Sequence, residues 1–181
     1  MADSIDELVP VLRDLVPLAR NRIATLGVDT EIGDAGTGRS RAEWAATLAS
    51  GATKATKFGL TWHAVKAKGE PPDAEGLAAS CAIDLWLVGT RSAKTGRPTS
   101  IDWASTNYAV IGQAYEELGL TWGGRFKNRV DGPHGQGPRL AHPDHKHWAM
   151  SISDLDDFCR DEINQTRALR GMPPLGRSAW V

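Results

Sequence analysis

The chain has 181 residues, of which 41% are hydrophobic and 24% charged, and its formal net charge is −1. This length and composition suit one globular domain with a sizeable core. Because the charges are nearly balanced and no long basic block occurs, the sequence lacks the electrostatic footprint of a nucleic-acid-binding protein.

The N-terminus and the cysteines indicate where the protein is made. Acidic residues, Asp3 and Asp6 among them, stand where a secretion signal would carry positive charge, and no apolar run approaches the ~18 residues of a membrane span. We therefore expect synthesis in the cytoplasm without a signal peptide, and no membrane span. Cys81 and Cys159 have no metal-like spacing; a single disulfide is possible, and two reduced thiols are favoured.

The first third of the chain predicts helix, strand and helix. Residues 4–7 read as a capping box, and apolar residues at helical spacing follow, with a kink or break expected at Pro17 and a stop at Gly27. Residues 28–32 alternate like a short strand, and residues 39–51 predict a second helix.

Asp84 lies in an apolar run from Ala82 to Val88 that predicts a buried strand. A carboxylate in such a run is costly unless it is paired or binds a metal, so Asp84 is a candidate ligand. The histidine upstream of it is His63. The residues between them, 66–73 in particular, are polar with two prolines, which is typical of a surface loop. Such an insertion costs little if its ends stay close.

A helix is predicted over residues 103–118, and a Trp-Gly-Gly turn at Trp122 follows it. Beyond the turn, Asp131 and His134 stand three residues apart. An acid and an imidazole at this spacing can share one site, where the imidazole binds a metal and the carboxylate takes a proton from a water there. An Asp-Gly-Pro-His string can also be only a turn.

A second pair with the same spacing, Asp144 and His147, competes for these roles. It lies at the start of residues 145–152, which we expect to form a strand. Residues 153–170 predict an amphipathic helix.

Several of these segments resemble the zinc peptidases that cut peptidoglycan stem peptides, namely the L-alanyl-D-glutamate endolysins of phages and the VanY-type D,D-carboxypeptidases. The matching segments are Arg39 to Glu43 with its following turn, Trp62-His63, Ala82-Ile83-Asp84, and residues 119–136. Two positions depart from the family pattern. Leu77 stands where the family spacing would place the first zinc ligand, and Gly135 follows His134 where the family has phenylalanine.

The resemblance implies an α+β fold, a small antiparallel sheet flanked by helices in a single domain, similar to hedgehog and D-Ala-D-Ala peptidases. Residues 1–150 would form the catalytic domain, and residues 151–181 a C-terminal helical extension packed on it.

The resemblance also implies a site. Zn²⁺ would be held by His63, Asp84 and His134, with Asp131 as the base. Arg39 would hold a substrate carboxylate. His147 and Asp144 stay open as alternatives to His134 and Asp131. We favour the first pair because its spacing from the Trp-Gly-Gly turn and its flanking residues fit the family's closing motif.

The implied function is zinc-dependent cleavage of peptidoglycan stem peptides, as by an L-Ala-D-Glu endolysin in bacteriophage lysis. One alternative is a D,D-carboxypeptidase, and another is a zinc-less peptidoglycan-binding or structural phage protein that retains the fold. The partner would be the stem peptide, with no nucleic acid, and the protein a monomer that reaches the cell wall by a separate release pathway.

Overall fold

The computed structural model describes residues 5–33, 36–38, 41–51, 61–64, 80–104, 106–128, 130–140 and 142–176. The elements of these segments, in chain order, are η1 (Ile5–Glu7), α1 (Pro10–Thr25), β1 (Thr30–Ile32), α2 (Arg41–Ala49), η2 (Trp62–Ala64), β2 (Ala82–Arg91), β3 (Pro98–Ile101), α3 (Tyr108–Leu118), β4 (Thr121–Trp122), η3 (Gly123–Arg125), β5 (His134–Gln136), α4 (His145–Trp148) and α5 (Ile152–Leu169). The expected α+β class, with a small antiparallel sheet, is confirmed. The domain boundary at residue 150 stays a prediction.

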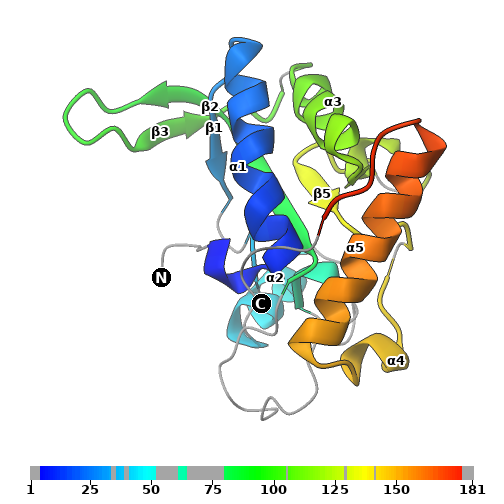
Figure 1. Cartoon of the computed structure of the whole chain (residues 1–181). Helices are drawn as coiled ribbons and strands as arrows, with labels where there is room; N and C mark the ends of the chain where they lie inside the picture. Colours follow the sequence, from blue (N-terminus) through cyan, green and yellow to red (C-terminus); the bar gives the residue numbers. More distant parts are fainter. Residues whose placement is uncertain are drawn as a thin grey trace.

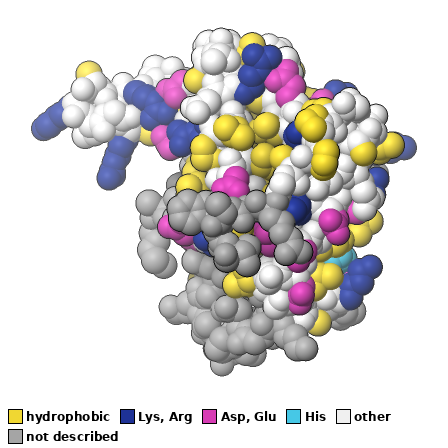
Figure 2. Space-filling model, in the orientation of Figure 1, with side chains coloured by type: hydrophobic (Ala, Val, Ile, Leu, Met, Phe, Trp, Pro, Cys, Tyr) yellow, Lys and Arg dark blue, Asp and Glu magenta, His cyan; other side chains and the backbone are white. Residues whose placement is uncertain are grey.

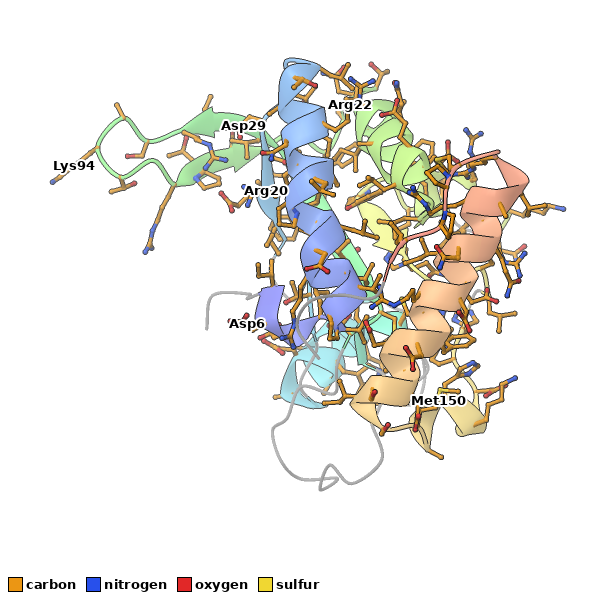
Figure 3. The ribbon with its side chains drawn as sticks, viewed as in Figure 1. Asp6, Arg20, Arg22, Asp29, Lys94 and Met150 are labelled. Carbon is orange, nitrogen blue, oxygen red and sulfur yellow. The ribbon has the colours of Figure 1, made fainter. Side chains whose placement is uncertain are left out.

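The sheet is built around β2, its longest strand. The strand order is β1-β2-β5-β4, with β3 also paired to β2, and all pairings are antiparallel. The far half of β2 and β3 form a hairpin that projects from the body of the molecule (Figure 1). Lys94 lies at its tip (Figure 3), where Figure 2 shows basic side chains reaching outward.

The alternation of residues along β2 assigns its two faces. Ile83, Leu85 and Leu87 are buried in a core that α1, α3 and α5 share. Asp84 and Trp86 alternate with them and are only half-buried, because successive side chains of a strand point to opposite faces. The predicted buried strand is thus confirmed, and it places Asp84 on the face opposite the apolar core residues.

The first helix, α1, differs from its prediction at its start, Pro10, and at Pro17. It begins at Pro10, which suits the first helical position, rather than in the capping box, and it continues through Pro17 to Thr25. Pro17 is exposed, whereas its neighbours Val16 and Ala19 are buried in the core. We infer that the packing of the apolar face outweighs the lost backbone hydrogen bond. None of the helices in the described segments is long and apolar enough to cross a membrane.

Gly135, a departure from the family pattern, has a packing explanation. It lies in β5 between two residues that face the site, and a Cβ added to it would lie 2.7 Å from the ring of Tyr115 in α3. Tyr115 is fully buried, and its hydroxyl donates to the Pro133 carbonyl at 3.1 Å. The tyrosine therefore occupies the space that a side chain at position 135 would need.

Gly135→Ala should consequently destabilise the protein by about 1–3 kcal/mol, the usual cost of overpacking a closed core. Denaturant unfolding measures this change. Gly176→Ala is the matched control, because an added Cβ there meets nothing within 4 Å. Equal stability of the two variants would contradict this account of Gly135.

Candidate metal centre

Three side chains from three separate elements meet at the centre of the sheet. They are His63 of η2, Asp84 of β2 and His134 of β5, and the last two are direct cross-strand partners. One ligand atom of each lies within 4.8 Å of the others, and among the described residues this is the group that could hold a metal ion. The structure thus brings together the three residues that the sequence resemblance implied as ligands.

The ring of His63 is held by the backbone. Its Nδ1 lies 3.0 Å from the Thr37 carbonyl oxygen, which can only accept, so Nδ1 carries the proton and Nε2 presents a lone pair. The loop that carries Thr37 is fixed in turn: the Glu7 carboxylate accepts from the Thr37 hydroxyl and from the Gly38 N–H. The Asp84 N–H donates to the Gly36 carbonyl at 2.7 Å, which ties this loop to the strand that carries the carboxylate.

The ring of His134 is held by a buried amide. Its Nε2 lies 2.9 Å from Oε1 of Gln136. The Gln136 amide nitrogen donates to the carbonyls of Pro138 and Leu140, so the amide oxygen must face the imidazole. His134 therefore carries its proton on Nε2 and presents the lone pair of Nδ1, the arrangement expected of a metal-binding histidine supported by a neighbouring acceptor.

The inner atoms of the cluster are all acceptors when the imidazole protons lie on the outer nitrogens. His63 Nε2 is 3.1 Å from His134 Nδ1 and 3.2 Å from Asp84 Oδ1, and His134 Nδ1 is 3.0 Å from the same oxygen. Two lone pairs and a negative charge at this separation repel one another unless a cation or a proton joins them. Two imidazoles, each oriented by an outer acceptor, and one carboxylate fit Zn²⁺.

The electrostatics of the cluster lead to the same conclusion. Burial acts to raise the pKa of the Asp84 carboxyl, but the charges and hydrogen bonds of His63 and His134 outweigh it and hold that pKa well below its usual range. Burial acts to lower the pKa of the His134 imidazole, and the Asp84 carboxylate outweighs it and raises that pKa. The cluster therefore stabilises positive charge, which a metal ion can supply in place of a proton.

Asp131 lies beside this cluster rather than in it. It is half-buried in the turn before β5, where its N–H donates to the Gly123 carbonyl at 3.0 Å and its own carbonyl accepts from the His134 N–H at 3.3 Å. Its charge is one of the influences that raise the pKa of His134. A Cβ on Gly123 would lie 2.6 Å from the Asp131 carbonyl oxygen, so glycine lets the Trp-Gly-Gly turn approach this closely.

The second Asp-x-x-His pair does not join the cluster. Residues 145–148 form helix α4, so the predicted strand is wrong, because the Asp144 carboxylate accepts from backbone N–H groups and caps a helix there. His147 is fully buried, and its ring packs 5.1 Å from that of Trp62 and 4.6 Å from that of Phe158. It supports the tryptophan that precedes His63.

The insertion between the first two candidate ligands begins and ends at neighbouring points. The Trp62 carbonyl accepts from the Cys81 N–H at 2.8 Å and from the Ser80 hydroxyl at 3.1 Å. The chain therefore returns to the place it left, which is the condition under which a long insertion costs little. Leu77 and the candidate substrate residue Arg39 lie outside the described residues.

The supporting functions of three residues were missed in the sequence. Thr37 contributes a backbone carbonyl, and no sequence pattern marks a carbonyl as a histidine partner. Glu7 reads as part of a helix cap, yet its carboxylate holds the loop of Thr37 instead. Gln136 is part of the closing motif, but its function as the acceptor for His134 appears only in the structure.

One segment of the chain matches the model of a known protein family. Residues 77–137, which include Asp84, Asp131 and His134, match the model of a family described as D-alanyl-D-alanine carboxypeptidase. Over these residues the resemblance inferred from the sequence is confirmed.

Among solved structures, the Serratia marcescens L-Ala D-Glu endopeptidase ChiX is similar, at 21% sequence identity and a TM-score of 0.45, over 73% of this chain and 81% of that chain. No curated protein matches significantly.

The site predicts a specific pattern of zinc loss. Wild-type protein incubated with zinc should hold about one ion per chain, and His63→Ala or His134→Ala should lower its zinc affinity sharply, because three protein ligands hold a catalytic zinc. His147→Ala should retain zinc and lose about 2–4 kcal/mol of stability, since it leaves a cavity beside Trp62. Elemental analysis and denaturant unfolding measure the two effects.

His142→Ala, at an exposed histidine, is the control that should change neither property. Zinc loss in His147→Ala together with retention in His134→Ala would transfer the ligand role to the second pair.

Proposed function

We propose that this protein is a zinc-dependent peptidase that cleaves peptidoglycan stem peptides between L-Ala and D-Glu. The observation that carries the proposal is the convergence of His63 Nε2, Asp84 Oδ1 and His134 Nδ1. The segment that matches the D-alanyl-D-alanine carboxypeptidase family, residues 77–137, contains two of these residues and supports the same chemistry.

In this proposal each residue has a defined task. Zinc bound by the cluster would supply Lewis acidity toward the scissile carbonyl and the attacking water. Thr37 and Gln136 keep the imidazole protons on the outer nitrogens, so His63 and His134 act as neutral ligands and not as acids. Asp131, beside His134, accepts a proton from the attacking water and passes it to the leaving amine.

The substrate contact of the proposal is Arg39, which rests on the sequence resemblance alone. A guanidinium can hold a carboxylate through two parallel hydrogen bonds, and the D-Glu residue that follows the scissile bond carries free carboxylate. We extend the proposal to a monomeric lysis enzyme of phage-endolysin type, which would reach the wall through a separate release pathway.

The second candidate function is a D,D-carboxypeptidase, which the description of the matching family favours. The third reading, a peptidoglycan-binding or structural phage protein without zinc, requires that the donor set has no function. The outward orientation of both imidazole protons by Thr37 and Gln136 argues for a functional set, because such support serves a metal ligand.

Digestion of purified peptidoglycan by the zinc-loaded protein tests the function. New D-Glu amino ends and no new reducing sugars are expected, as read by end-group analysis and mass spectrometry. Release of terminal D-Ala alone would select the carboxypeptidase, and glycan cleavage would exclude the peptidase. Lack of any cleavage by protein that holds zinc would leave the proposal without support.

If Asp131 is the proton acceptor, its substitution should affect the rate of cleavage and not the binding of zinc. Asp131→Asn should retain zinc, because Asp131 lies outside the ligand cluster, while the rate of cleavage falls by roughly 10²–10⁴-fold, the usual contribution of a positioned proton acceptor. Asp144→Asn is the matched control, since its carboxylate caps α4 and lies 2.8 Å from His147 Nδ1, outside the ligand cluster; it should keep both zinc and rate. A fully active Asp131→Asn variant would show that another group takes the proton.

A further inference from the structure

An aromatic pair lies next to the metal centre on the same face of the sheet. Trp86 stands two residues beyond Asp84 in β2, and its indole ring lies 5.1 Å from that of Trp103 at an interplanar angle of 64°. Trp103 is 60% exposed, which is unusual for so large an apolar side chain. The mechanism proposed above uses neither residue.

The strand register explains why these residues share a face with Asp84. Val88 of β2 pairs with Ile101 of β3, and Trp103 follows Ile101 by two residues. Because side chains alternate along a strand, Trp86 points to the same side as Asp84, and the ring contact brings Trp103 to that side. Two residues of extended strand place the Cα of Trp86 about 7 Å from that of Asp84.

The indole of Trp86 is fixed in this position by a glycine. A Cβ added to Gly33 would lie 2.3 Å from Trp86 Nε1, so the ring lies directly over the glycine backbone. Trp103 packs against its edge and leaves much of its own surface to solvent. The pair therefore forms an aromatic surface at the edge of the candidate site.

In the proposed substrate, a sugar ring lies about as far from the scissile bond as Trp86 lies from Asp84. The L-Ala of a stem peptide is joined to N-acetylmuramic acid through a lactyl group of about one residue's length. One residue and the lactyl group separate the L-Ala–D-Glu bond from the sugar ring by roughly 7 Å. The terminal D-Ala–D-Ala bond lies more than about 15 Å from that ring, because four residues intervene.

We propose that Trp86 and Trp103 form a subsite for the N-acetylmuramic acid ring that carries the stem peptide. This inference rests on the proposed function and names the part of the substrate that this face recognises. A pyranose presents a face of C–H groups surrounded by hydroxyl groups, so it can lie on an indole while its hydroxyls stay hydrated. The subsite favours cleavage next to the sugar, and hence the L-Ala–D-Glu bond over the terminal one.

Binding of two small probes by the full-length protein tests the subsite without any turnover. N-acetylmuramoyl-L-alanine carries the sugar, and N-acetyl-L-alanine lacks it. The wild-type protein should bind the first probe roughly 2- to 10-fold more tightly, the range expected of one aromatic contact. Titrations followed by NMR shifts of the indole N–H groups give both dissociation constants.

Substitution of Trp103 identifies the surface. Because Trp103 is largely exposed, Trp103→Ala should fold normally, with an unchanged Tm, and should lose the preference for the sugar-bearing probe. Trp103→Phe should keep part of it. Lys94→Ala, at the tip of the β2–β3 hairpin (Figure 3), is the matched control and should keep the full preference.

Equal binding of the two probes by the wild type, or an unchanged preference in Trp103→Ala, would overturn the subsite. A preference that disappears in Lys94→Ala and persists in Trp103→Ala would assign recognition to charge and also overturn it. The proposed function is tested separately. Protein that cleaves the stem peptide without the preference keeps its function and loses the subsite, whereas protein that shows the preference and never cleaves loses only the function.

Discussion

The close approach of His63 Nε2, His134 Nδ1 and Asp84 Oδ1 is the constraint on which the rest of the structure depends. Acceptor atoms at 3.0–3.2 Å are unfavourable neighbours unless a positive charge lies among them. The surrounding protein therefore has to hold the two imidazoles from outside. It does so with groups that are themselves anchored, since Thr37 is held by Glu7, and the amide of Gln136 by two carbonyls. The N-terminal segment is thus structurally part of the site, although it lies far from it in sequence.

How much of this arrangement the sequence could predict depends on the range of each interaction. Asp84 was identified because a carboxylate in an apolar strand requires a partner, and this argument needs only the residues next to it. The helix α5 and the strand β2 were likewise predicted from local patterns. The continuity of α1 through Pro17 was not, because the buried residues that stabilise it contact distant parts of the chain. The contact of the Thr37 carbonyl with His63 was not predicted either, because every residue has a backbone carbonyl.

The two Asp-x-x-His pairs show how a shared spacing leads to different structures. In the first, residues 132 and 133 turn the chain into β5, so His134 lies opposite Asp84 on the neighbouring strand. In the second, the Asp144 carboxylate turns back to the N–H groups of the following residues and starts a helix, so His147 enters the core. The local hydrogen bonds of the carboxylate, and not the spacing, decide which structure forms.

The register of β2 couples the stability of the core to the geometry of the site. Ile83, Leu85 and Leu87 fix which side of the strand faces the helices, and a slip of one residue would turn Asp84 into the core and three apolar side chains out of it. The same register sets the distance between Asp84 and Trp86. The core residues therefore determine both the position of the candidate ligand and its separation from the aromatic surface. Tyr115 adds to this coupling from α3, because it fills the space beside Gly135 and bonds to the Pro133 carbonyl, directly before His134. Changes deep in the helical layer can thus move the candidate metal ligands without touching them.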